Sequence, residues 1–424
     1  MRIWTAWPRL LSGPSRRWFS DGKLLWALAL ASAGAQAIAA LRDHHIDTPQ
    51  IWGGLKSFLH GASPYGVVTH LPFGYDHPPG STLIDAPLGL LSLSAASDLI
   101  VLVSAATCML AIFALCGRRL DLVSWRVALA ALIIGVSRPF HEELTLGNID
   151  LLAMFAMAMG LVALERGRER IGSLLLALGA CVKPTAALVL LAPALAKRWR
   201  GTVLAVSAVV VITLIGFAVV PHSGRFFTSV VPFLTGPEQG HADYNTSFTG
   251  VVEYVGLGNV LDATVTQLMA LAGFVALAVR YRLVLARSLE ASVALLVIAG
   301  LLVPRYSFEV YGLYLVLALP FILKAKGPLE VSLAALAVWF LAIRDVLPLH
   351  GAAVNRFREL RPGLGHLALA VLLALILDRQ LRKEHSGLDG ECASGKQHST
   401  ESSDESRAAG VSARSPVSHP VRTP

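Results

Sequence analysis

The chain has 424 residues, of which 54% are hydrophobic and 15% charged, and its mean hydropathy is +0.61. Soluble domains carry about 25% charged residues, so this composition excludes an ordinary soluble protein and indicates a polytopic membrane protein. The net charge of +8 comes from small basic clusters between apolar blocks. This distribution follows the positive-inside rule and argues against a nucleic-acid partner.

Residues 1–23 are basic and precede a first apolar segment at residues 24–41. We expect this segment to be a retained transmembrane helix, because no cleavage site followed by a soluble domain comes after it. The basic N-terminus favours a cytoplasmic location, which places the loop after this helix on the outer side. That loop opens with Arg42-Asp43-His44-His45-Ile46-Asp47. These titratable residues are either ordinary solvated loop residues or the surroundings of a catalytic base at the membrane surface.

Two short helices are expected next, the first within the loop, which runs to about Pro79, and the second after it. Residues 51–59 are expected to form a helix on the surface, and the block at residues 81–93 is too short to span. We therefore interpret the second block as a re-entrant or interfacial helix.

Apolar blocks of roughly 15–22 residues then recur along the chain, the pattern of transmembrane helices. Further spans are expected near residues 96–116, 122–138, 148–164, 171–182, 184–196, 201–220, 261–280, 287–304, 308–323, 328–343 and 363–380. The stretch 171–196 is interpreted as a hairpin of two short helices bent at Lys183-Pro184, because basic residues flank both its ends. We thus predict an all-α bundle of about twelve transmembrane segments over residues 24–383. The tail, residues 384–424, is predicted to be disordered and cytoplasmic.

Several basic residues fall on the outer side and break the charge rule. A ligand with a phosphate at the outer headgroup level would explain them, since Arg and Lys are suited to phosphate. Contact with lipid headgroups is the alternative. These residues are Arg42, Lys56, Arg138, Lys183, Arg225, Arg305, Arg344, Arg356, Arg358 and Arg361.

Five motifs occur in the order found in a known family. They are Asp47 with Gly61-Ala62-Ser63-Pro64-Tyr65; His77-Pro78-Pro79 with Ala86-Pro87-Leu88; Gly147-Asn148-Ile149-Asp150; Cys181-Val182-Lys183-Pro184; and Asn245-Thr246-Ser247-Phe248-Thr249-Gly250. Over residues 24–323 this series resembles the polyprenol-phosphate-sugar-dependent glycosyltransferases of family 87, which have the multispanning GT-C fold. The chain departs from the family pattern at Asn148, Asp150 and Thr246. It also has Phe308-Glu309-Val310-Tyr311 where members often have Trp-Asp-His-His.

The resemblance implies transfer of a sugar from a polyprenyl phosphate to an acceptor hydroxyl. The sugar is expected to be a hexose, mannose being the common choice in the family, with the pentose arabinofuranose as the alternative. The acceptor would be a glycan or glycolipid, and the reaction a single displacement with inversion. Asp47 takes the position of the catalytic base that accepts the hydroxyl proton. The donor phosphate is expected to contact Lys183 and Arg305, with Arg138 behind them.

Further substrate contacts are expected from five residues, two of which are aromatic. For these two, a place in the aromatic belt at the outer membrane interface is the alternative. They are Trp52, Tyr65, Asn148, Asn245 and Glu309. No metal and no cofactor are expected. The resemblance places the protein in a bacterial inner membrane, in contact with membrane lipids and with its site on the periplasmic side.

A polytopic transporter or lipid flippase without transferase activity is the competing interpretation. Broken helices and charges within the membrane suit that class as well. The crowding of polar residues on one face, rather than at the midplane, favours the enzyme.

Overall fold

The computed structural model describes residues 22–43, 46–66, 75–117, 124–232, 245–258, 260–342 and 352–398. Within these ranges the regular structure is entirely helical. Five helices are long and apolar enough to cross a membrane: α3 (Lys23–Ala40), α6 (Leu93–Cys116), α12 (Trp199–Val219), α15 (Ala263–Arg280) and the Leu360–Lys383 part of α20 (Ala352–His398). The prediction of a polytopic all-α membrane protein is thereby confirmed.

Two shorter helices form a broken span or a re-entrant loop. They are α8 (Arg138–Leu146) and α9 (Asp150–Glu165), and their axes are bent by 117°. The chain turns between them at Gly147, whose φ of 68° lies in the left-handed region that glycine adopts without strain. This bend brings a polar turn to the place where an apolar helix begins.

The other expected spans are represented by apolar helices of 10–17 residues. These are α7 (Trp125–Val136), the Ala186–Leu195 segment, α17 (Leu289–Leu302), the Val310–Ile322 segment and the Pro328–Phe340 part of α19 (Pro328–Ala342). The Ala186–Leu195 segment combines η3 (Pro184–Leu191) with α11 (Ala192–Leu195), and the Val310–Ile322 segment combines η7 (Glu309–Ala318) with α18 (Leu319–Ile322).

The remaining helices are shorter. They are α4 (Asp47–Leu59), η1 (Pro64–Gly66), α5 (Pro79–Asp85), η2 (Ala86–Leu90), α10 (Glu169–Val182), η4 (Phe226–Val230), α14 (Phe248–Tyr254) and α16 (Arg282–Arg287). Among them α10 covers the span expected at residues 171–182. The short surface helix predicted at residues 51–59 exists but begins earlier, at Asp47. The block predicted as re-entrant or interfacial forms α5 and η2.

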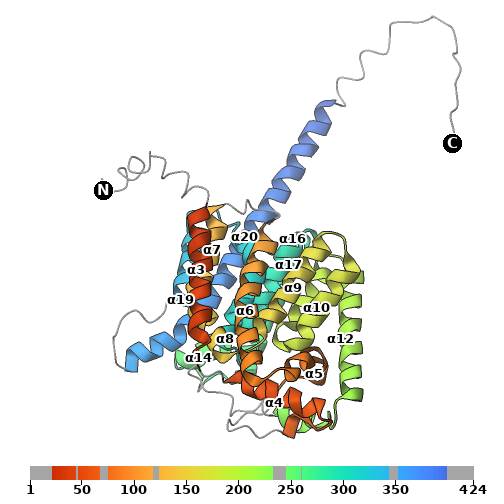
Figure 1. Cartoon of the computed structure of the whole chain (residues 1–424). Helices are drawn as coiled ribbons and strands as arrows, with labels where there is room; N and C mark the ends of the chain where they lie inside the picture. The colour runs from red at the N-terminus through yellow and green to blue at the C-terminus, as the bar shows by residue number, and fades with distance from the viewer. Residues whose placement is uncertain are drawn as a thin grey trace, which may run out of the picture. The chain divides into compact units, whose positions relative to one another are not determined.

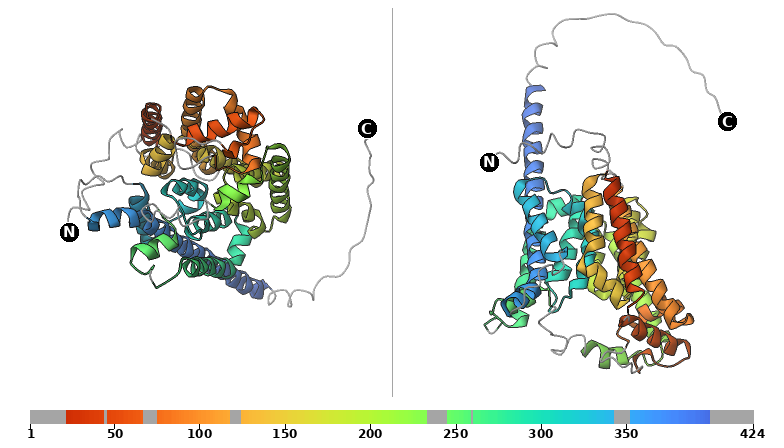
Figure 2. Two further views of the ribbon diagram at one scale, coloured as in Figure 1. Left: turned by 90° about the horizontal axis from the view of Figure 1, so that it is seen from below. Right: turned by 60° about the vertical axis from the view of Figure 1, so that its left-hand side comes forward.

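The long helices of the bundle run side by side, with α4, α5, α8 and α14 gathered at one end (Figure 1). The further views in Figure 2 show the same grouping of short helices at that end. At the centre of the bundle α9 packs on α6 and α10, and α10 packs on α12. Gly160 of α9 and Gly172 of α10 meet so closely that a Cβ on Gly172 would lie 2.7 Å from the Gly160 carbonyl oxygen. Small residues of this kind let transmembrane helices approach each other.

The break predicted at Lys183-Pro184 is confirmed. Helix α10 ends at Val182, Lys183 is extended with φ −132° and ψ 95°, and Pro184 begins η3. A proline disfavours helical geometry in the preceding residue, which explains why the helix ends here.

The C-terminal part of the chain, from Asp378 onward, forms a separate compact unit. Its described part is the end of α20, which continues to His398 and so extends beyond the boundary expected at residue 383. Within this unit Arg382 pairs with Asp378 one turn earlier (Nη2–Oδ2 2.7 Å), a spacing that supports an exposed helix.

Candidate active site

The start of α4 is attached to the turn between α8 and α9. Thr48 is buried, and its hydroxyl donates to the carbonyl oxygen of Gly147 at 2.8 Å. Beside it, Nδ2 of Asn148 donates to Oδ2 of Asp47 at 3.1 Å. Because Asp47 is the first residue of α4, these two bonds place its carboxylate against the beginning of α9.

The side chain of Asn148 is held by its own turn. Its Oδ1 accepts the backbone N–H of Ile149 at 2.7 Å, which fixes the amide so that Nδ2 points to Asp47. Two sequence-predicted site residues, one expected as the base and the other as a substrate contact, are therefore in direct contact. In this arrangement Asn148 orients the carboxylate.

Behind this contact lies a buried group of charged residues from α8, α9 and the break after α10. Glu143 of α8 accepts the backbone N–H of Asp150 at its Oε1 (3.1 Å) and thereby satisfies a free donor at the start of α9. Oδ1 of Asp150 lies 2.8 Å from Nζ of Lys183, with side-chain exposures of 2% and 11%. Lys183 thus reaches the site from the break after α10, paired with a carboxylate.

A second polar cluster comes from α5 and the residues before it. His77 lies between two carboxylates, with Nδ1 3.5 Å from Oδ2 of Asp85 and Nε2 3.7 Å from Oδ1 of Asp76. Ser81 donates to the same Asp85 oxygen at 2.5 Å. His77, Ser81 and Asp85 are buried, whereas the Asp76 side chain is 46% exposed.

The electrostatics of Asp47 connect the two clusters. Burial raises the pKa of its carboxyl above the ordinary value of 3.8; the Lys183 charge opposes this shift, Asp76 adds to it, and His77 and the Asn148 hydrogen bond oppose it. A carboxylate with a raised pKa accepts a proton more readily at neutral pH than an exposed one. The environment of Asp47 therefore suits a general base.

The two aromatic residues predicted to contact sugar occupy different places. The Tyr65 hydroxyl donates to the carbonyl oxygen of His77 (3.1 Å), and its ring lies 5.8 Å from that of Tyr75. Trp52 donates from Nε1 to the carbonyl oxygen of Leu91 (3.0 Å), and Lys56 lies over its ring. Tyr65 consequently adjoins the His77 cluster, while Trp52 holds α4 against the end of η2.

Asn245 organises a neighbouring loop. Its Nδ2 donates to the Arg305 carbonyl oxygen (2.8 Å), and its Oδ1 accepts the backbone N–H of Ser247 and of Ser307, both at 3.1 Å. The Ser247 hydroxyl donates to the same Arg305 carbonyl and caps α14. All of these contacts are to backbone groups, so Asn245 fixes the position of the Arg305 backbone, from which its guanidinium extends.

The other two cations expected at the donor phosphate, Arg305 and Arg138, contact neighbouring side chains. The exposed Arg305 guanidinium lies over the Tyr306 ring, 5.3 Å from its centroid. Arg138 donates from Nε to Oε1 of Glu142 at 2.5 Å. It begins α8, and its Cα is separated from the Gly147 end of that helix by about 13 Å at 1.5 Å per residue.

Other expectations fall outside the described part of the structure. The side chain of Glu309 is one of them, although its backbone begins η7. His44, His45, Arg344 and the side chains of Arg356 and Arg358 also lie outside the described part. Among the described residues no three His, Cys, Asp or Glu side chains form a group that could hold a metal.

Three buried residues of the site were not selected from the sequence. Glu143 is absent from the sequence-predicted candidates, and neither His77 nor Asp85 is among them, although His77 opens the His77-Pro78-Pro79 motif. A signal for Glu143 exists, since two adjacent glutamates precede the Gly147-Asn148 turn between apolar blocks. Carboxylates next to apolar segments are costly and point to function.

The fold and the site together define a multi-pass helical membrane protein with a partly buried carboxylate, a cation and a histidine cluster at one end of its bundle. The model of glycosyltransferase family 87 matches residues 75–308, more than half of the chain. The chain belongs to glycosyltransferase family 87. Asp47, Trp52 and Tyr65 precede the matched region, and Glu309 follows it.

The chain is also similar to curated proteins named alpha-(1->3)-arabinofuranosyltransferase. The protein of Corynebacterium glutamicum is 24% identical over 256 residues, which cover 58% of this chain and 60% of the relative. Those of Mycobacterium tuberculosis strains CDC 1551 and H37Rv are 28% identical over 267 residues, covering 61% of this chain and 60% of each relative. The aligned region spans about 60% of the length of these relatives.

Proposed function

We propose that this protein is a membrane glycosyltransferase that transfers a sugar from a polyprenyl-phosphate donor to an acceptor hydroxyl, with Asp47 as the general base. The observation that carries the proposal is the contact of Asp47 with Asn148, at the start of α9 and next to the Lys183–Asp150 pair. It joins the first-loop carboxylate to the region that the family model matches.

The proposed step is one displacement. The acceptor oxygen attacks the anomeric carbon while the bond from this carbon to the phosphate oxygen breaks, so that the electron pair leaves on the polyprenyl phosphate. The hydroxyl proton passes to Asp47, and the sugar configuration inverts. A single carboxylate suffices, whereas a double displacement would need a second carboxylate as nucleophile about 5 Å from the first.

The leaving phosphate needs positive charge rather than a proton. Lys183 is the first candidate, because its charge is the largest effect that opposes the raised pKa of Asp47. Its pairing with Asp150 means that a phosphate would share the ammonium with this carboxylate. Arg305 remains the second candidate, and Arg138 the third because it lies at the far end of α8.

The sugar proposed first is a pentofuranose such as arabinofuranose, because the similar curated proteins are named for its transfer. A mannosyl donor is the competing choice, which the family resemblance favoured. The acceptor is proposed to be a glycan or glycolipid. The proposed location is a bacterial plasma membrane, with the site on the outer side as the positive-inside rule indicates.

The test reconstitutes the full chain in proteoliposomes with radiolabelled polyprenyl-phosphate-arabinofuranose or polyprenyl-phosphate-mannose and a bacterial envelope extract as acceptor. Label in the glycan fraction from either donor, lost in Asp47→Asn, supports the proposal and identifies the sugar. Saturable movement of the intact donor across the vesicle, without transfer, would instead establish the transporter interpretation.

A further inference from the structure

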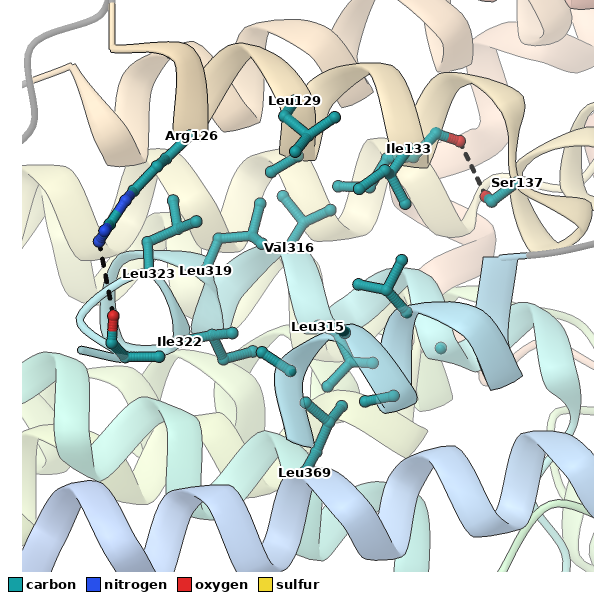
Figure 3. A pocket seen from close by; sticks show the side chains of 18 of the residues that line it. Arg126, Leu129, Ile133, Ser137, Leu315, Val316, Leu319, Ile322, Leu323 and Leu369 are labelled. Atoms are coloured by element: carbon teal, nitrogen blue, oxygen red, sulfur yellow. Dashed lines mark hydrogen bonds between the residues drawn. The ribbon is translucent and has the colours of Figure 1, made fainter. Parts of the chain in front are cut away.

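A groove with an apolar lining runs along α7 and is separate from the site. It has a volume of about 490 Å³, within the range of about 300–1,000 Å³ typical of ligand pockets. Its walls come from α7, the Val310–Ile322 segment, α19 and Leu369 of α20. Figure 3 shows leucine, isoleucine and valine side chains pointing into it between Arg126 and Ser137.

The two ends of the groove differ in charge. At one end Arg126 is exposed, donates to the carbonyl oxygen of Ala325 (3.5 Å) and lies beside the Trp125 ring. The next residue after Ala325 is the exposed Lys326, so two cations flank this end. At the other end the Ser137 hydroxyl is already bonded to the Ile134 carbonyl at 2.8 Å. Of the residues that line the described groove, Arg126 is the charged one.

The length of the groove fits one lipid chain. The twelve residues of α7 (Trp125–Val136) extend for about 18 Å, and one leaflet of a bilayer core is about 15 Å thick. A chain that entered beside Arg126 would therefore end near Ser137. Exposed tryptophan and cations at the same end are the side chains that lie at a membrane headgroup region.

We propose that this groove binds an acyl chain of an anionic glycerophospholipid whose phosphate contacts Arg126 and Lys326. The polyprenyl donor is not the proposed occupant, because a phosphate at Arg126 would lie almost a full α7 length from the α7–α8 junction, whereas Asp47 contacts Asn148 just after the other end of α8. The lipid would instead fill the space between α7 and α19 and hold these helices together from the side opposite the site. This inference is independent of the proposed transferase activity.

Native mass spectrometry of the full-length protein in nanodiscs tests the proposal, with phosphatidylglycerol and phosphatidylcholine of identical chains as probes. Wild-type protein is expected to retain phosphatidylglycerol preferentially. Arg126→Gln with Lys326→Gln should weaken its retention by roughly fivefold per cation, as expected for about 1 kcal/mol each. The matched control is Arg200→Gln, because Arg200 is exposed next to the exposed Trp199 at the start of α12 and lines no part of the groove.

A second variant tests the groove itself. Ala334→Trp places an indole among the lining residues and should reduce retention of both phospholipids while the thermal unfolding of the protein remains cooperative. Equal retention of the two phospholipids by wild type, or equal effects of the Arg126/Lys326 and Arg200 variants, would overturn the proposal. Preferential retention of undecaprenyl phosphate over phosphatidylglycerol would also overturn it, in favour of a donor-lipid site.

Discussion

Asn148 donates a hydrogen bond of 3.1 Å to Asp47 across 101 positions of sequence. The donor stands at the bend between α8 and α9, and the acceptor at the first turn of α4. This bond makes the carboxylate of an outer loop part of the helical bundle. The orientation of the proposed base therefore depends on the bend, and predictions about activity begin with this pair.

Asp47→Asn is expected to reduce sugar transfer by at least 100-fold, because general base catalysis contributes about 10²–10⁴ and the amide cannot accept the proton. Transfer in proteoliposomes is the measurement. Asp43→Asn is the matched control, since Asp43 is exposed and lies in the same loop. Wild-type transfer by Asp47→Asn would refute the assignment of the base.

The same variant should unfold at a higher temperature at pH 7. Burial raises the pKa of Asp47 in the folded state, so ionisation of this group costs stability as the pH rises from 3.8 through the folded pKa. Asparagine carries no charge, so it removes this cost above the folded pKa. Below pH 3.8 the carboxyl of wild type is neutral as well, and the variant gains nothing from this effect. Thermal unfolding of both proteins at acidic and neutral pH measures the difference, and an equal difference at every pH would contradict the cause given.

Lys183→Met is expected to move the acidic limb of the pH profile to higher pH. The Lys183 charge opposes the increase in the pKa of Asp47, so its removal lets that pKa rise further. Since the base acts only when ionised, kcat/KM would fall at a higher pH than in wild type. Lys183→Arg keeps the charge and should keep the profile. A profile of Lys183→Met superimposed on that of wild type would remove Lys183 from the electrostatics of the base.

The Lys183–Asp150 pair has a structural role that a double variant separates from catalysis. Asp150→Asn alone leaves a buried ammonium without its counter-charge and is expected to cost about 3–5 kcal/mol of stability. Asp150→Asn combined with Lys183→Met should recover most of this stability without recovering transfer. Chemical denaturation and transfer assays measure the two effects, and recovery of transfer in the double variant would show that the ammonium is not needed for chemistry.

His77→Phe is expected to lower kcat by about 100-fold, the lower end of the range for acid–base groups, with little change in donor KM. His77 lies close enough to lower the pKa of Asp47, and Asp85 and Ser81 hold its ring. Asp85→Asn should reproduce part of the effect by releasing the ring. The control is His222→Asn, an exposed position with φ of 54° where asparagine is well tolerated. An effect on KM alone would assign His77 to donor binding.

Asn245→Ala tests whether this residue positions Arg305 or contacts substrate. The variant removes three hydrogen bonds and leaves buried backbone groups without partners, for an expected loss of about 2–4 kcal/mol. If Arg305 holds the donor phosphate, the donor KM should rise in Asn245→Ala and in Arg305→Gln to a similar extent. An unchanged KM in both variants would exclude this loop from the donor site.

The sequence was sufficient for the features that depend on local composition. The length and apolarity of residues 24–41, 96–116 and 201–220 predicted helices α3, α6 and α12. The break at Lys183 followed from one proline and the basic flanks. By contrast, no helix was predicted between the spans expected at 122–138 and 148–164, where α8 lies, because residues 138–146 include four charged or histidine side chains and lack the apolar run of a span.

The contacts of the site could not be predicted in the same way. No local pattern connects Asp47 with Asn148, and only the order of the family motifs suggested that they belong together. The His77 cluster depends on α5 turning Ser81 and Asp85 back toward His77, which the turn-forming prolines did not reveal. Contact of Asn148 and Asn245 with substrate was predicted on the basis that their side-chain amides are available to a ligand. In the structure both amides instead form hydrogen bonds with neighbouring groups of the chain.

The glycine contact between α9 and α10 has a consequence for the ion pair at the ends of these helices. Asp150 lies ten positions before Gly160, and Lys183 lies eleven positions after Gly172. The two arms of this helical hairpin are therefore nearly equal, about 15 and 16.5 Å long, and meet at Asp150 and Lys183. The contact between Gly160 and Gly172 therefore fixes how far α9 and α10 are shifted along each other. A methyl group at Gly160 would shift the two arms against each other and change the electrostatics of the base from about 15 Å away.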